Sequence, residues 1–196
     1  MSEASAFRVA VVLAGFFLAV NLSARADFSA AERALAAGNL ERTHDELVPL
    51  AALGDARAQN LLAVFYQNGW IVERDPTRAA ELYRMAGDQG LSRALHNLGR
   101  LYRSGLGVPQ DPSMAAELWK QAGRMGFVKS QSALGALYYE GAGVEQDMFR
   151  AYFWWSLAAR RLEIEATQAR EDVIYRLTPH EKEVADALVE RFEADR

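Results

Sequence analysis

The fold is decided by residues 91–126, whose sequence is LSRALHNLGRLYRSGLGVPQDPSMAAELWKQAGRMG. The same pattern occurs on both sides of this stretch, because a step of 36 residues carries Gly54 to Gly90 and Gly90 to Gly126. A fixed period of this length is typical of a solenoid, in which each unit buries its apolar face against its neighbours. Other residues that recur with the same step are Tyr66, Tyr102 and Tyr138, Val72, Val108 and Val144, Asp75, Asp111 and Asp147, and Ala79, Ala115 and Ala151.

Each copy of the pattern predicts two helices joined by a short loop. Apolar residues within 94–102 recur at the spacing of one helix face, and the glycines within 104–107 then end the helix. Asp111 and Pro112 start a second helix, since Asp accepts hydrogen bonds from free N–H groups and Pro has no such bond to lose. The bulky residues expected to fill the space between units are Tyr83, Trp119 and Trp155.

The predicted fold is therefore an all-α, right-handed solenoid of antiparallel helix pairs. Thr178, Pro179 and Glu181 form the capping-box pattern that opens an amphipathic last helix, which suits a terminal cap. The predicted parts of the chain are a signal peptide at 1–26, an N-terminal half-repeat region at 27–54, repeats at 55–90, 91–126 and 127–162, and a partial repeat with a C-terminal capping helix at 163–196.

Residues 1–26 have the pattern of a secretory signal peptide. Arg8 precedes an apolar run at 9–20, and the sequence Ala-Arg-Ala at 24–26 places small residues where a signal peptidase cleaves. Cleavage is expected to leave Asp27 as the first residue. The alternative is an uncleaved anchor, although the run is shorter than the ~20 residues of a membrane-spanning helix. We therefore expect an exported, periplasmic protein with no stable membrane span after cleavage.

Composition and motifs argue against several function classes. The chain has a formal net charge of −4, which is unlike a general nucleic-acid binder, and no cysteine for a thiol catalyst or a cysteine-based metal site. It contains no serine-nucleophile elbow, zinc-binding His-Glu-x-x-His or phosphate-binding loop. We therefore predict no catalytic, cofactor-binding or metal-binding residue and no enzymatic activity. The repeated aspartates are predicted to be helix N-caps rather than metal ligands: Asp75, Asp111 and Asp147.

The repeat resembles the Sel-one-like repeat, a 36-residue relative of the tetratricopeptide repeat. The matching residues of the second copy are Leu98, Gly99, Tyr102, Gly105, Gly107, Val108, Asp111, Ala115, Trp119 and Ala122. The first copy departs from the pattern, because Ala63 replaces the helix glycine and residues 70–72 replace the Gly-x-Gly-Val ending. The resemblance implies a protein-interaction adaptor, and exported members are similar to envelope scaffolds. Some members are cysteine-rich lactamase or penicillin-binding proteins, a branch that the lack of cysteine disfavours.

A basic stripe is predicted on the concave side, where first helices lie in such arrays. Segments 56–67, 92–103 and 128–139 contain five cations and no carboxylate, in an acidic chain. This stripe is a candidate docking site for an acidic protein surface. The alternative is that Arg57 and Arg93 pair with Asp55 and Asp88 and the other cations are only solvated. With Trp70 added as an exposed aromatic anchor, the predicted partner-binding residues are Arg57, Asn60, Gln67, Trp70, Arg93, His96, Arg100, Arg103, Lys129 and Tyr139.

Three functions remain open at this point. The first is an exported, non-catalytic scaffold or regulator that binds protein partners, and a smooth basic groove would favour it. The second is a cell-envelope enzyme acting on cell-wall or β-lactam substrates, which buried acids in a deep pocket would favour. The third is a carbohydrate-binding accessory of polysaccharide export, which a shallow groove lined by aromatic residues such as Tyr139 would favour.

Overall fold

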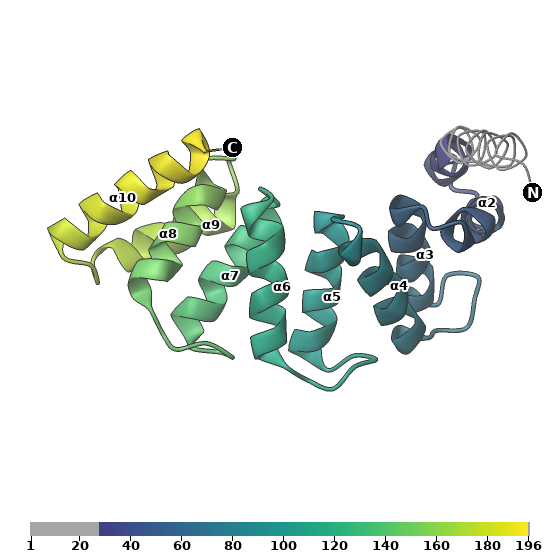
Figure 1. Cartoon of the computed structure of the whole chain (residues 1–196), viewed down its shortest axis with the longest axis horizontal. Coiled ribbons are helices and arrows are strands. Elements are labelled where there is room, and N and C mark those ends of the chain that lie inside the picture. Colours follow the sequence, from purple (N-terminus) through teal and green to yellow (C-terminus); the bar gives the residue numbers. More distant parts are fainter. Residues whose placement is uncertain (1–27, 196) are drawn as a thin grey trace, which may run out of the picture. The chain divides into compact units, whose positions relative to one another are not determined.

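The computed structural model describes residues 28–195, and every regular element in this part of the chain is an α-helix (Figure 1). The predicted all-α fold is confirmed, and consecutive helices pack as pairs. Residues 28–36 are helical, and the labelled helices that follow are α2 (Leu40–Ala52), α3 (Ala56–Asn68), α4 (Pro76–Asp88), α5 (Ser92–Ser104), α6 (Pro112–Arg124), α7 (Val128–Glu140), α8 (Met148–Ala159), α9 (Ile164–Ile174) and α10 (Pro179–Ala194).

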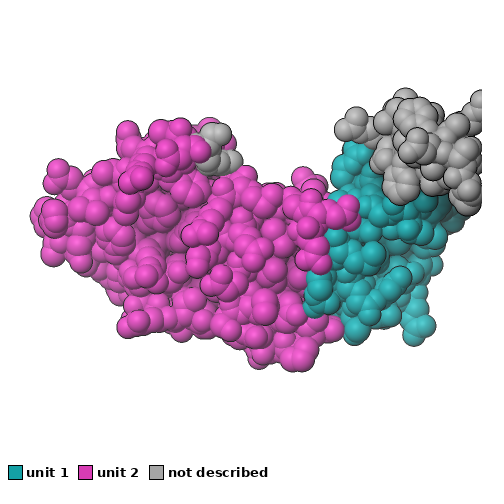
Figure 2. Space-filling model, in the orientation of Figure 1, with its two compact units in different colours: residues 1–86 teal, residues 87–196 magenta. Residues whose placement is uncertain are grey.

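The predicted signal peptide lies outside the described residues. Among the helices that the structure does describe, none has both the length and the apolarity needed to span a membrane. The chain divides into two compact units, Met1–Ala86 and Gly87–Arg196, with the boundary inside α4 (Figure 2). In the first unit α2 packs against α3, and the hydroxyl of Tyr83 donates to Gln67 Oε1 at 2.8 Å.

In the second unit the helices pack in chain order, α5 on α6, α6 on α7, α7 on α8 and α8 on α9. The core of this unit is rich in indole rings and leucines, since Trp119, Trp155, Leu134 and Leu137 are all buried. α10 packs across α8. Contacts that hold it there include a hydrogen bond from Tyr152 to Asp186 at 2.8 Å and ion pairs of Arg160 with Glu190 and of Arg161 with Glu193 at 2.7 and 3.1 Å.

Local signals explain where the helices begin. Three aspartates accept backbone N–H bonds at helix starts. Asp75 accepts from Arg78 at 2.9 Å, Asp111 from Ser113 and Met114 at 3.0 Å, and Asp147 from Arg150 at 2.8 Å. Bonds from the Ser113 hydroxyl and the Met114 N–H lower the pKa of Asp111, because they favour its ionised form. The predicted capping role of the three aspartates is confirmed, as is the capping box at Thr178 and Glu181.

A glycine on the first helix of a pair makes room for a tryptophan on the second. A Cβ added to Gly135 would lie 2.6 Å from Trp155 Cδ1, and one added to Gly99 would overlap the indole of Trp119. The indole N–H groups donate to main-chain oxygens of the first helices, from Trp119 to His96 at 3.0 Å and from Trp155 to Ser132 at 3.1 Å. The first repeat has Ala63 and Tyr83 at the corresponding positions, so the smaller ring accompanies the larger helix residue.

We predict that Gly99→Ala lowers the free energy of unfolding by about 1–3 kcal/mol, the usual cost of overpacking a core. Alanine is the better helix former by about 1 kcal/mol, so a net loss would report the overlap with Trp119. Urea denaturation followed by circular dichroism measures the change. The double variant G99A/W119Y, which reproduces the pair found in the first repeat, should recover part of the loss. A Gly99→Ala variant as stable as the wild type would contradict this packing account.

Candidate partner-binding site

Two neighbouring cavities in the second unit contain half of the predicted partner-binding residues, Arg93, His96, Arg100, Arg103 and Lys129. The first, here called the basic cavity, has a volume of about 510 Å³ and lies between α5 and the start of α7. Its α5 residues are spaced by one, three or four positions and so share one helix face, while the opposite face is buried in the core. The residues lining it are Arg93, His96, Asn97, Arg100, Gly126, Phe127, Val128 and Lys129.

Of the residues that the structure describes, three cations and no carboxylate line the basic cavity. Arg93, Arg100 and Lys129 are exposed, and none of them has a carboxylate within 4.0 Å among residues 28–195. The alternative pairing of Arg93 with Asp88 is therefore not formed. The N-cap residue of α7, Phe127, supplies no side-chain hydrogen bond, so the positive end of the helix dipole adds to the potential. The cavity is thus a region of uncompensated positive charge in an acidic chain.

His96 is held in the wall of the basic cavity by two aromatic rings. Its ring stacks on Trp119 at 5.9 Å between centroids and lies 5.3 Å from the ring of Phe127. Its Nδ1 is 3.0 Å from the hydroxyl oxygen of Ser130. Burial, and then the charges of Arg100 and Lys129, lower the pKa of His96 to about 4. At neutral pH His96 is therefore an uncharged hydrogen-bonding group. The positive charge of the cavity comes from Arg93, Arg100 and Lys129.

The second cavity, here called the mixed cavity, has a volume of about 560 Å³ and carries both signs of charge. Arg103 lies here, but its guanidinium pairs with Glu140 at 3.0 Å and does not line the basic cavity with Arg93 and Arg100. Lys129 lines both cavities. The residues lining the mixed cavity are Arg103, Lys129, Ser132, Ala133, Ala136, Trp155, Glu163, Glu165 and Ala169.

Tyr139 lines neither cavity. Its ring packs 5.6 Å from that of Trp155, and the guanidinium of Arg176 lies 5.5 Å over it. Arg176 therefore covers one face of the Tyr139 ring, and that face is not open to a ligand.

The predicted residues of the first unit are mostly engaged within that unit. Arg57 pairs with Asp55 at 3.3 Å, which is the pairing that the alternative to a docking role predicted. Its guanidinium also lies 4.1 Å from the centroid of the Phe28 ring. Asn60 is buried, and Gln67 accepts the hydroxyl of Tyr83. Trp70 is 39% exposed, with one edge against Phe65 at 5.6 Å between centroids. Continuity of the basic stripe over both units stays a prediction.

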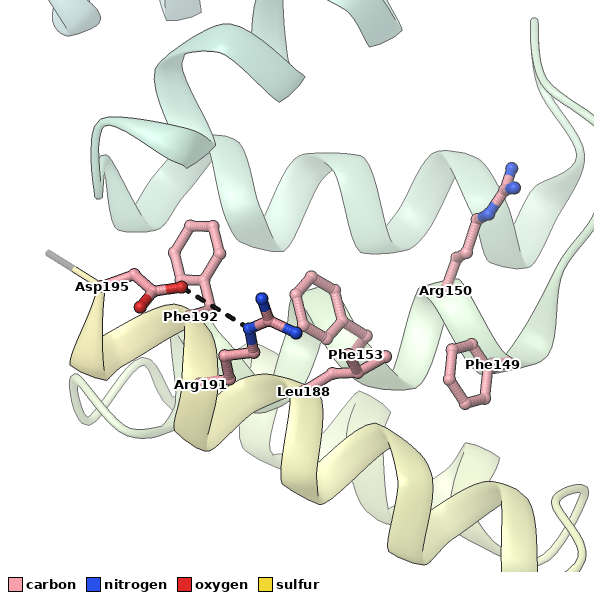
Figure 3. Close-up of a pocket in the computed structure, with 7 residues that line it drawn as sticks. All are labelled: Phe149, Arg150, Phe153, Leu188, Arg191, Phe192 and Asp195. Carbon is pink, nitrogen blue, oxygen red and sulfur yellow. Dashed lines mark ion pairs between the residues drawn. The ribbon is translucent and has the colours of Figure 1, made fainter.

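Sequence reasoning missed an apolar pocket of about 300 Å³ between α8 and α10. Figure 3 shows that phenyl rings from both helices line it, Phe149 and Phe153 from α8 and Phe192 from α10. The sequence does show apolar residues spaced by four, Phe149 and Phe153 on α8 and Leu188 and Phe192 on α10. The repeat period, however, does not predict that these two helices face each other. The other lining residues are Leu188 and three charged residues, Arg150, Arg191 and Asp195, with an ion pair between the last two at 3.7 Å.

The Sel1 repeat model matches residues 56–91, 92–127 and 128–161, which is more than half of the chain. The chain belongs to the Sel1 repeat family. Members of this family are generally non-catalytic scaffolds, and their repeats typically mediate protein interactions. A comparison with curated proteins gave no match.

Two solved structures share the fold. The first is a protective antigen of uropathogenic Escherichia coli strains displaying an SLR fold, with a TM-score of 0.72, 28% identity, and coverage of 78% of this chain and 32% of that one. The second is a Sel1 repeat protein from Oxalobacter formigenes, with a TM-score of 0.65, 27% identity, and coverage of 68% of this chain and 53% of that one. This chain therefore spans about a third of the first relative and about half of the second.

We predict that His96 makes stability depend on pH. The unfolded chain takes up the proton near the ordinary pKa of 6.5 and the folded chain near 4, so the unfolded state binds more protons between these values. The free energy of unfolding therefore falls as pH is lowered from 6.5 to 4. Thermal denaturation at a series of pH values should show a shallower fall for His96→Gln than for the wild type. Parallel curves would contradict the neutral, buried state of His96.

Proposed function

We propose that this chain is an exported, non-catalytic scaffold of the periplasm that docks an acidic segment of a partner protein in the basic cavity. The observation that carries the proposal is the set of Arg93, Arg100 and Lys129, which line one cavity and have no carboxylate partner among residues 28–195. An arginine guanidinium forms paired hydrogen bonds with a carboxylate, which gives geometry as well as attraction.

Three observations favour protein docking over the other candidate functions. Ser130, the hydroxyl beside His96, is fully buried, so this pair offers no accessible nucleophile. No group of three or more His, Asp or Glu residues that would hold a metal ion occurs in the described part of the chain. Tyr139, the aromatic residue expected to stack on a sugar, is covered by Arg176. The cavities instead present charged side chains at the surface.

Export is supported by the sequence alone, through Arg8, the apolar run at 9–20 and the small residues at 24–26. N-terminal sequencing of protein recovered from the envelope fraction should begin at Asp27. An intact Met1 in that fraction would contradict cleavage.

We predict that the double variant R93E/R100E binds an acidic probe at least roughly ten-fold more weakly than the wild type, equivalent to about 1.4 kcal/mol. Fluorescence anisotropy with a fluorescein-labelled hexaglutamate peptide measures the affinity. Binding by the wild type should also weaken as salt rises, because exposed charges are screened within about 8 Å at physiological ionic strength.

The matched control is K120E/R124E, which changes the net charge equally but lies on α6, outside both cavities. This control should retain most of the binding, and both variants should keep wild-type helical content. Equal loss in the two double variants would mean that only the total charge matters, and it would refute the basic cavity as the docking site.

A further inference from the structure

The charged side chains that line the two cavities differ, because those of the basic cavity are all positive and those of the mixed cavity include carboxylates. Arg93 and Arg100 line the basic cavity, Lys129 lines both, and Glu163 and Glu165 line only the mixed cavity. The positive charge of Arg103 in the mixed cavity is compensated by its ion pair with Glu140. A ligand crossing from one cavity to the other therefore passes from cations near α5 to carboxylates at the start of α9.

The carboxylates of the mixed cavity retain capacity for a cation. Glu163 Oε2 caps α9 by accepting the N–H of Ala166 at 2.6 Å and lies 3.4 Å from the hydroxyl of Ser132. Glu165 is exposed and has no cation within 4.0 Å in the described part of the chain. Since an ionised carboxyl group can accept several hydrogen bonds, both groups remain able to bind an ammonium or guanidinium group.

Small and aromatic side chains between these charges suit a long basic residue. Ala133, Ala136, Ala169 and the indole of Trp155 supply apolar surface within the mixed cavity. Lysine and arginine pack their methylene chains along such surface while the charged end stays in contact with water or a carboxylate. A ligand with only acidic groups would instead meet repulsion from Glu163 and Glu165.

We propose that the partner segment is bipolar, with an acidic side chain in the basic cavity and a lysine or arginine in the mixed cavity. This inference rests on the proposed function and deepens it by naming the order of charges in the partner. Complementary charges of both signs fix the register of a bound segment and reject competitors with one sign only. A polyanion can therefore use only the basic cavity, and the site favours a bipolar segment over it.

The test compares labelled peptides that differ only at the basic end. One carries two glutamates, a flexible spacer and two lysines, and the other carries two glutamines in place of the lysines. Spacers of several lengths between two and six residues cover the span between the cavities. At the best spacer length, anisotropy should show that the lysine peptide binds at least roughly five-fold more tightly than the glutamine peptide. Glu165→Gln should remove this advantage without weakening the glutamine peptide, while Glu171→Gln, an exposed change on α9 outside both cavities, should preserve it.

The outcomes separate this inference from the proposed function. Equal binding of the two peptides at every spacer length, or an advantage that survives Glu165→Gln, would overturn the bipolar partner. Binding of hexaglutamate that depends on Arg93 and Arg100 would then still support docking of an acidic segment. If no peptide binds in a manner that depends on these arginines, the proposed function fails and the inference fails with it. Circular dichroism of each variant confirms that the fold is intact.

Discussion

The contact between Trp119 and the backbone at Gly99 is the constraint on which the second unit depends. A side chain at residue 99 would occupy the space of the indole, so α5 and α6 can approach this closely only with glycine there. The indole then donates to the main-chain oxygen of His96 and stacks on the imidazole ring of the same residue. A core contact thereby fixes the wall of the basic cavity. The same arrangement recurs with Gly135, Trp155 and Ser132, in the next helix pair.

This packing places the charged residues on a rigid surface. Arg93 and Arg100 lie on the face of α5 opposite its buried residues, and Lys129 lies in the first turn of α7, so the positions of all three follow from helices rather than from a flexible loop. Such preorganisation lowers the cost of ordering the side chains when a partner binds. Fold stability and charge pattern are thereby separated on the two faces of one helix, which allows the charged face to vary without disturbing the core.

The period of 36 residues was enough to predict the helix pairs, the aspartate caps and the burial of Tyr83, Trp119 and Trp155, because each depends on local sequence or on contacts between equivalent positions. The pairing of Arg103 with Glu140 could not be predicted from the helix faces, because it joins the ends of two different helices, α5 and α7. The apolar pocket was missed for a different reason. It depends on α10 crossing α8, and the repeat does not specify this arrangement.

The central claim is that the acidic ligand occupies the space between α5 and the start of α7. Nuclear magnetic resonance of ¹⁵N-labelled protein, titrated with hexaglutamate peptide, tests this location directly. The account predicts that the amide shifts change most at residues 93–100 and 127–130 and little in α2, around Trp70 or along α10. Shifts concentrated in the pocket between α8 and α10, or distributed evenly over all exposed cations, would contradict it.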